Sequence, residues 1–183
     1  MPETLSHRCW LTADEHPTLG ELVDRSVALL REHEPPGGYY GCFSGGKDSV
    51  ALRGLAERAR VRVSWHYNHT TIDPPPLMRF MQEHHADVHW VRPRYGPLLI
   101  RAAEVKGFPT RKARWCCSEY KEGMNPPSAT LLMGIRAEES ARRAARWSLV
   151  QKHFRTGSLC VQPLLDWSSD DLWEFIRTER VPY

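Results

Sequence analysis

Long apolar runs are missing from this sequence, and none approaches the roughly 18 residues that a membrane-spanning helix needs. The N-terminus, Met1-Pro2-Glu3-Thr4, also lacks the charged and then apolar pattern of a secretory signal peptide. We therefore expect a cytoplasmic protein with no membrane partner. A strong net charge is missing as well: +3 at pH 7 requires no anionic partner larger than a nucleotide, and it leaves nucleic acid open.

A regular cysteine pattern is missing from the sequence. The chain has five cysteines, an odd number, which argues against the disulfide framework of a small secreted protein. No Cys-x-x-Cys pair is present. Free thiols, a catalytic thiol and metal ligation all remain open. The five residues are Cys9, Cys42, Cys116, Cys117 and Cys160.

The composition that is present is ordinary for a globular protein. The chain has 183 residues, 41% of them hydrophobic and 26% charged, which suits one soluble domain with a buried core. Residues 1–17 show no strong period and are expected to form an irregular extension. Residues 18–183 are expected to form the domain itself.

The most informative stretch runs from Ser44 to Ser49 and reads Ser-Gly-Gly-Lys-Asp-Ser. The aromatic segment before it predicts a short buried strand over 38–43, and a 3.6-residue period predicts a helix over 49–60. Glycines at a helix N-terminus let the backbone approach a phosphate, while Lys47 adds a mobile positive charge. The spacing differs from the GxxxxGK[ST] P-loop, so a plain glycine-rich turn with an exposed Lys-Asp pair is the alternative.

The remaining pattern predicts alternating strands and helices. Thr18 is expected to cap a helix over 19–32, and Ser168 or Ser169 the last helix. A strand over 61–68, after the first strand and helix, implies a right-handed βαβ unit and a parallel sheet. The fold class is therefore α/β, a mostly parallel twisted sheet flanked by helices. Further helices are expected over 76–85 and 98–106, and further strands over 87–91, 130–134 and 160–165.

In such sheets, ligands bind beyond the carboxyl ends of the strands. The loop from Asn68 to Asp73 is therefore expected to lie beside the glycine-rich turn. Within it, His69 has a surface-loop interpretation as its alternative.

A cysteine pair stands among cations in the segment over 110–121. Positive side chains at this density are expected to lower the pKa of Cys116 or Cys117 and to attract anions. A solvated basic helix start with two buried thiols is the alternative.

A second basic motif follows the strand over 130–134 and begins with Gly134. Arg136 and Arg143 could hold phosphate or sulfate oxygens through paired guanidinium hydrogen bonds. The alternative is an exposed amphipathic helix with internal ion pairs.

Together these motifs resemble one family. The segment Ser44 to Ser49 resembles the PP-loop of the ATP pyrophosphatase superfamily, and the downstream features resemble its phosphoadenosine phosphosulfate (PAPS) reductase branch, over about residues 19–183. The resemblance implies a Rossmann-type, adenine nucleotide alpha hydrolase-like fold. It also implies phosphate or nucleotide contacts for Ser44, Gly45, Gly46, Lys47, Asp48, Ser49, Asn68, Arg114, Lys121, Gly134, Arg136, Ser140 and Arg143.

The resemblance also suggests chemical roles. Lys47 would stabilise a pyrophosphate leaving group, and Asp48 would help to hold Mg²⁺ with ATP. Cys116 or Cys117 would handle sulfur or ligate an iron–sulfur cluster. Such a cluster normally takes four thiolates, so further ligands from a tail or a partner would be needed.

Three functions remain in contention. ATP cleavage between the α- and β-phosphates, coupled to sulfur or adenylyl transfer, is favoured because Lys47 and Asp48 are both present. A thiol-dependent reductase of PAPS or adenosine phosphosulfate that releases sulfite is the second, and a non-catalytic nucleotide-binding module is the third. An unknown acceptor is expected, and a thiol or sulfur-donor protein and a second copy of the chain remain open as partners.

Overall fold

The computed structural model describes residues 17–153 and 156–183 and contains a six-stranded sheet in the order β3-β2-β1-β4-β6-β5. All neighbouring strands run parallel except β5, which pairs antiparallel with β6 at the edge. The predicted α/β class with a mostly parallel sheet is confirmed. The strands are β1 (Tyr39–Cys42), β2 (Val63–Asn68), β3 (His89–Val91), β4 (Leu131–Leu132), β5 (Val150–Lys152) and β6 (Leu159–Val161).

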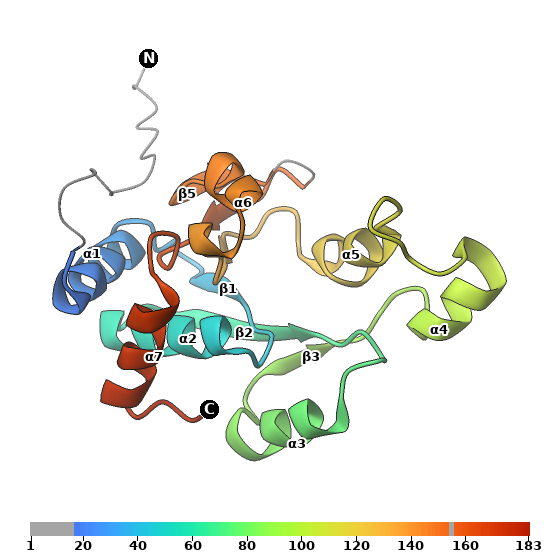
Figure 1. The fold of residues 1–183 in the computed structure, drawn as a ribbon, viewed down its shortest axis with the longest axis horizontal. Coiled ribbons are helices and arrows are strands. Elements are labelled where there is room, and N and C mark those ends of the chain that lie inside the picture. The colour runs from blue at the N-terminus through green and yellow to red at the C-terminus, as the bar shows by residue number, and fades with distance from the viewer. Residues whose placement is uncertain (1–16, 154–155) are drawn as a thin grey trace.

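Helices connect these strands, and Figure 1 shows α1, α2 and α7 gathered on one side while α4 and α5 lie at the opposite end of the molecule. The α-helices are α1 (Leu19–Glu32), α2 (Lys47–Ala59), α3 (Pro75–His84), α4 (Leu98–Arg101), α5 (Trp115–Tyr120), α6 (Ala141–Arg146) and α7 (Ser169–Thr178). Short turns of other helix types are η1 (Ala102–Lys106), η2 (Glu122–Met124) and η3 (Ala137–Glu139). No helix in the described ranges is long and apolar enough to cross a membrane.

Both predicted helix caps form. Thr18 accepts a hydrogen bond from the backbone of Glu21, whose carboxylate reaches back to the Thr18 backbone, a complete capping box. Ser168 and Asp171 make the same arrangement at α7. These reciprocal bonds satisfy backbone donors that would otherwise be unpaired at each helix start.

The core lies between the sheet and the α1, α2 and α7 layer. Tyr39 and Gly41 of β1 point toward it, as does Phe43 just after the strand, in the alternation that the period of a strand requires. Gly41 has no room for a side chain, because a Cβ there would lie 2.3 Å from Cε3 of Trp65. The hydroxyl of Tyr39 donates to the carbonyl of Leu30 at 2.8 Å, which ties β1 to α1.

Two features differ from the sequence-based expectation. The edge strand β5 was not expected, and the helix over 98–106 is α-helical only to Arg101 before it widens into a π-helical turn. Gly107, with φ of +71°, ends it as predicted. The predicted irregular extension, except for residue 17, lies outside the described residues.

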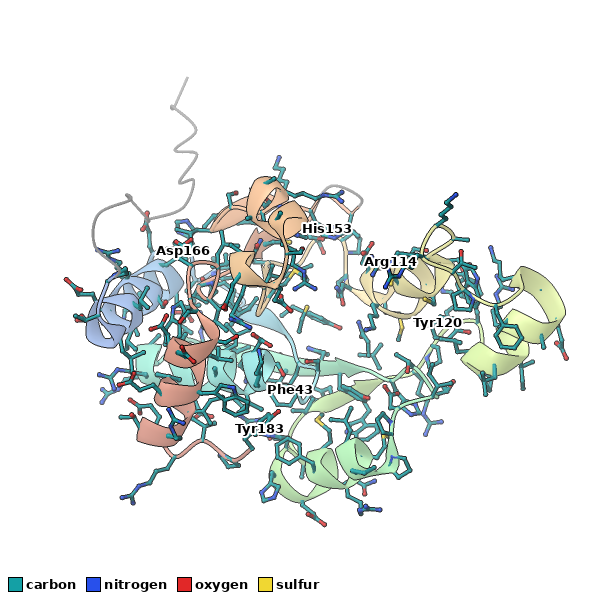
Figure 2. The ribbon with its side chains drawn as sticks, viewed as in Figure 1. Phe43, Arg114, Tyr120, His153, Asp166 and Tyr183 are labelled. Carbon is teal, nitrogen blue, oxygen red and sulfur yellow. The ribbon has the colours of Figure 1, made fainter. Side chains whose placement is uncertain are left out.

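The connection from β3 to β4 is long and leaves the body of the molecule. It carries α4, η1, α5 and η2, with Pro93 just after β3 and the pair Pro126-Pro127 before β4. Figure 2 shows Arg114 and Tyr120 in this part, away from Phe43 and Asp166 in the body. We call residues 92–121 the basic module.

Candidate nucleotide-binding site

The glycine-rich turn lies between the carboxyl end of β1 and the N-terminus of α2. Gly45 has φ of +71°, and a Cβ there would lie 2.5 Å from Cδ1 of Leu77, so both conformation and space require glycine. Ser49 donates from Oγ to the carbonyl of Gly46 at 2.8 Å, and Ser44 Oγ donates to Ser49 Oγ at 3.2 Å. Gly46 caps the helix without a side-chain acceptor, so the first backbone N–H groups of α2 are available to an anion.

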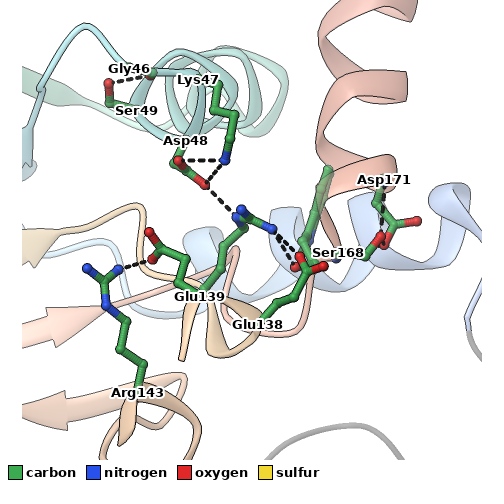
Figure 3. A network of polar contacts seen from close by, with 11 residues as sticks. Gly46, Lys47, Asp48, Ser49, Glu138, Glu139, Arg143, Ser168 and Asp171 are labelled. Carbon is green, nitrogen blue, oxygen red and sulfur yellow. Dashed lines mark hydrogen bonds and ion pairs between the residues drawn. The ribbon is translucent and has the colours of Figure 1, made fainter. Parts of the chain in front are cut away.

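Four charged side chains form a continuous network at this helix start (Figure 3). The Lys47 Nζ lies 3.1 Å from Asp48 Oδ2, and Arg136 donates from Nε to Asp48 Oδ1 at 2.5 Å. Arg136 also donates from Nη1 to Glu138 at 2.6 Å, and its side chain is only 3% exposed. The guanidinium predicted to hold phosphate is therefore paired with two carboxylates in this structure, and its phosphate role stays a prediction.

The carboxyl end of β4 lies against the same helix. A Cβ on Gly134 would lie 3.0 Å from the carbonyl oxygen of Asp48, so the close approach of the two segments depends on glycine. Beyond it, Ser140 caps α6 by accepting from the backbone N–H of Arg143, and the Arg143 side chain pairs with Glu139. Gly134 and Arg136 thus reach the glycine-rich turn, while Ser140 and Arg143 are engaged in local contacts.

Asn68 connects the sheet to the basic module. Its Nδ2 donates to the carbonyl of Lys121 at 2.9 Å and to Oδ1 of Asn125 at 3.1 Å. Its own Oδ1 is buried, and within the described residues it accepts no hydrogen bond. The structure therefore brings Asn68 and Lys121 together and leaves a buried acceptor at the carboxyl end of β2.

The cysteine pair lies in α5 and is half-buried. Arg114 donates from Nη2 toward Cys117 Sγ at 3.4 Å. Burial raises the pKa of the Cys116 thiol, and the neighbouring Cys117 raises it further, whereas Lys121 acts in the opposite direction. The prediction that surrounding cations lower the pKa is wrong for Cys116, because burial outweighs them.

The described residues fit the predicted Mg²⁺ site better than the predicted iron–sulfur cluster. Among the described residues no three histidine, cysteine or acidic side chains gather as a metal site. A single carboxylate such as Asp48 is compatible with Mg²⁺, which is commonly held by one or two carboxylates together with water and phosphate oxygens. Cys116 and Cys117 supply only two of the four thiolates of an iron–sulfur cluster, so the described chain does not complete one.

Two clefts open beside the segment that follows β3, which the sequence analysis did not single out. The first has a volume of about 570 Å³ and includes His69, Trp90 and Arg92 in its lining. The second, of about 280 Å³, lies between Arg92 and Tyr95 on one side and Ser118 and Glu119 of α5 on the other. The rule that places ligands at strand carboxyl ends could have indicated this segment as well.

Comparison with known proteins identifies the family. Residues 39–183 match the model of the phosphoadenosine phosphosulfate reductase domain. An uncharacterized protein of Methanocaldococcus jannaschii is 24% identical over 152 residues, which is 77% of this chain and 32% of that protein. The chain therefore spans about a third of the length of this relative.

Solved structures share the fold. The PAPS reductase of Candida auris in a phosphate complex has a TM-score of 0.64 at 14% identity, covering 96% of this chain and 91% of that one. The FMN adenylyltransferase of Candida glabrata with ATP has a TM-score of 0.56 at 16% identity, with 90% and 58% covered. The U34-tRNA thiolase of Methanococcus maripaludis with its [4Fe-4S] cluster has a TM-score of 0.58 at 13% identity, with 98% and 74% covered. From the extent of the family match, we conclude that the chain belongs to the phosphoadenosine phosphosulfate reductase domain family.

Proposed function

We propose that this chain binds ATP with Mg²⁺ at the N-terminus of α2 and cleaves it between the α- and β-phosphates, passing the adenylyl group to an acceptor for adenylyl or sulfur transfer. The observation that carries this proposal is the position of Lys47 and Asp48 in the first turn of α2, beside a glycine whose backbone has no room for a side chain. A cation and a carboxylate at a phosphate-binding helix start are suited to expel pyrophosphate.

We assign each member of the charge network around Asp48 a role in ATP cleavage. Lys47 is held by Asp48 and lies at the helix start, where it can follow negative charge as it develops on a leaving pyrophosphate. Asp48 would contact Mg²⁺, which would arrive with the nucleotide and would neutralise phosphate charge. Arg136 orients the Asp48 carboxylate by donating to its Oδ1, and Gly134 lets the two segments approach. The ATP complex of the FMN adenylyltransferase, which shares the fold, supports an adenine nucleotide as the ligand.

A thiol-dependent reductase that releases sulfite is the second candidate. The observation in its favour is the pair Cys116 and Cys117 beside Arg114, because a thiol next to a guanidinium can meet an anionic sulfur group. The shared fold with the PAPS reductase of Candida auris supports it as well. The raised pKa of Cys116 weakens it, since the thiolate is the nucleophile.

The test is a turnover assay of purified protein with Mg²⁺ and either ATP or PAPS plus a thiol reductant, scoring pyrophosphate, AMP and sulfite. We expect ATP to bind with micromolar affinity by calorimetry, and we expect Lys47→Ala to reduce pyrophosphate release by about 100-fold. Lys152→Ala, which removes an exposed lysine of β5, is the matched control and should keep the wild-type rate.

The outcomes of the turnover assay distinguish the three candidate functions. Sulfite from PAPS with no pyrophosphate from ATP would replace the proposal with the reductase. Binding of ATP without release of pyrophosphate or AMP would reduce the protein to a nucleotide-binding module. Equal loss of pyrophosphate release in both lysine variants would contradict the role given to Lys47.

A further inference from the structure

Positive charge is concentrated in one part of the chain. The basic module, residues 92–121, holds eight lysines and arginines against two glutamates, a net charge of +6. The whole sequence carries only +3, so the other residues together carry −3. The modest overall charge therefore conceals a strongly basic region joined to a weakly acidic body, a distribution typical of a surface that meets a polyanion.

Half of the module's eight cations are exposed and free for a ligand. Glu119 pairs with Arg101 at 3.2 Å and with Lys106 at 3.1 Å, so those two cations are partly neutralised. The exposed side chains of four other cations make no ion pair with any carboxylate of the described chain. These four are Arg92, Arg94, Arg111 and Lys112.

Exposed rings accompany the cations. Phe108, between η1 and α5, is 71% exposed, and Tyr95 is about half exposed with the Arg101 guanidinium over its ring at 4.6 Å. Large apolar side chains at this exposure are costly unless a partner covers them, and aromatic faces among cations are the combination on which unpaired bases stack.

The two clefts are lined in part by exposed residues of the module, namely Arg92, Arg94 and Tyr95. The larger one, with Trp90 and His69 in its wall and ring centroids 5.7 Å apart, is wide enough for a base and its sugar. Arg92 lines both clefts, and the second reaches Ser118, the residue after Cys117. A strand bound along the module would therefore pass between the carboxyl end of β3 and the cysteine pair.

From these four observations we propose that the basic module binds a single-stranded stretch of nucleic acid, with its phosphates on the exposed arginines and lysines and its bases against Phe108 and the two clefts. If the proposed function holds, the bound nucleic acid is the class of acceptor that receives the transferred group. The binding of nucleic acid itself does not depend on the proposed function. RNA binding is measured without ATP, so a negative result would contradict this inference without bearing on ATP cleavage.

The experiment is fluorescence anisotropy with a labelled 12-nucleotide RNA of mixed sequence, titrated with the full chain between 50 and 200 mM salt. Neutralising the four exposed cations, as Arg92→Gln, Arg94→Gln, Arg111→Gln and Lys112→Gln together, should weaken binding at least tenfold and flatten the slope of log affinity against log salt by about 3. The matched control neutralises four exposed cations of the body and should bind as the wild type does. Its substitutions are Arg79→Gln, Lys152→Gln, Arg177→Gln and Arg180→Gln.

A second variant separates nucleic acid from a protein partner. Phe108→Leu keeps apolar bulk but removes the aromatic face, so we expect about tenfold weaker RNA binding, whereas an apolar protein contact would be largely kept. A DNA 12-mer of the same sequence shows whether the ligand is RNA or single-stranded DNA. Tighter binding of the RNA would identify the ligand as RNA, and equal binding would mean that single strands of either kind are bound.

Three outcomes would overturn the proposal. The first is no RNA binding by the wild type at 50 mM salt. The second is equal loss of affinity in the module variant and in the body control. The third is displacement of the RNA by polyglutamate of the same total charge, which would show that any polyanion suffices, an acidic protein included.

Discussion

At the N-terminus of α2, charges separated by 88 positions in the sequence meet in a network built on the buried Arg136, which lies between Asp48 and Glu138. In the basic module, the printed ion pairs join Glu119 to Arg101 and Lys106 of the same module. Several other cations have no carboxylate partner among the described residues, and large apolar side chains such as Val105 and Phe108 stay exposed. The first region is built by long-range packing and balances its own charges. The second contributes little to the core and leaves positive charge unbalanced, so its sequence is under fewer packing constraints.

The comparison predicts unequal tolerance to substitution, and the largest effect is expected at β1. Gly41→Ala should cost about 3 kcal/mol of the free energy of unfolding, because the new Cβ would overlap the Trp65 ring at 2.3 Å. Urea denaturation followed by tryptophan fluorescence measures it. Gly20→Ala, on an open face of α1, is the control and should stabilise by several tenths of a kcal/mol. Equal midpoints for Gly41→Ala and the wild type would contradict the packing described for β1.

The next effect concerns the charge network. Arg136→Met keeps the length of the side chain but leaves Asp48 and Glu138 without their guanidinium, so we expect a loss of about 2 kcal/mol. Arg94→Gln, an exposed position in the basic module, should change stability by no more than about 0.5 kcal/mol. The same urea titration compares the two. If the two substitutions had similar costs, the contrast between an enclosed and an open charge would be lost.

A pH effect should follow from His85, which packs against Phe43, the residue between β1 and the glycine-rich turn. Burial, and then the nearby Arg53, lower the pKa of His85 from 6.5 to about 4. Above pH 6.5 the side chain is neutral in both states, but between pH 6.5 and 4 only the unfolded chain gains a proton. Stability is therefore complete above pH 6.5 and is lost as the pH falls toward 4, by about 1.5 kcal/mol at pH 5.

The measurement for this prediction is the free energy of unfolding at pH 7 and pH 5 for the wild type and His85→Gln. The variant lacks the titrating ring and should lose less stability between the two pH values. Identical pH dependence in both proteins would show that His85 titrates normally in the folded chain.

The smallest effect is expected in the basic module itself. Val105 is 60% exposed, so Val105→Ala should change the free energy of unfolding by less than about 0.5 kcal/mol. Val50→Ala, at a fully buried position in α2, is the matched substitution and should cost at least about 1.5 kcal/mol. Thermal denaturation of both variants would sharpen the comparison. A large loss from Val105→Ala would mean that the module contributes to the core after all.

Short-range sequence patterns were sufficient to predict much of the fold. The unit β1-α2-β2 followed from a strand period, a glycine-rich turn and a helix period that agree with one another. Thr18 could be assigned as a cap from the sequence, whereas Ser168 and Ser169 both remained candidates for the last helix. In the structure Thr18 and Ser168 are the caps, and each has its partner acid three positions later. These signals lie within a few residues of each other, so they are readable without tertiary structure.

The features that escaped prediction depend on distant partners. The strand β5 is three residues long, too short for a period, and exists through its pairing with β6. The carboxylates around Arg136 include Asp48, which no spacing rule connects to it. The direction of the Cys116 pKa shift depended on burial, which the density of cations in the sequence does not reveal.

The prolines at the two ends of the connection from β3 to β4 have a thermodynamic consequence. Pro93 and the pair Pro126-Pro127 fix φ where the chain leaves the body and where it returns. The polypeptide therefore samples fewer backbone conformations at both junctions before any ligand arrives. Less conformational entropy remains to be lost when a ligand orders the segment. A larger share of the free energy of each ligand contact therefore contributes to affinity.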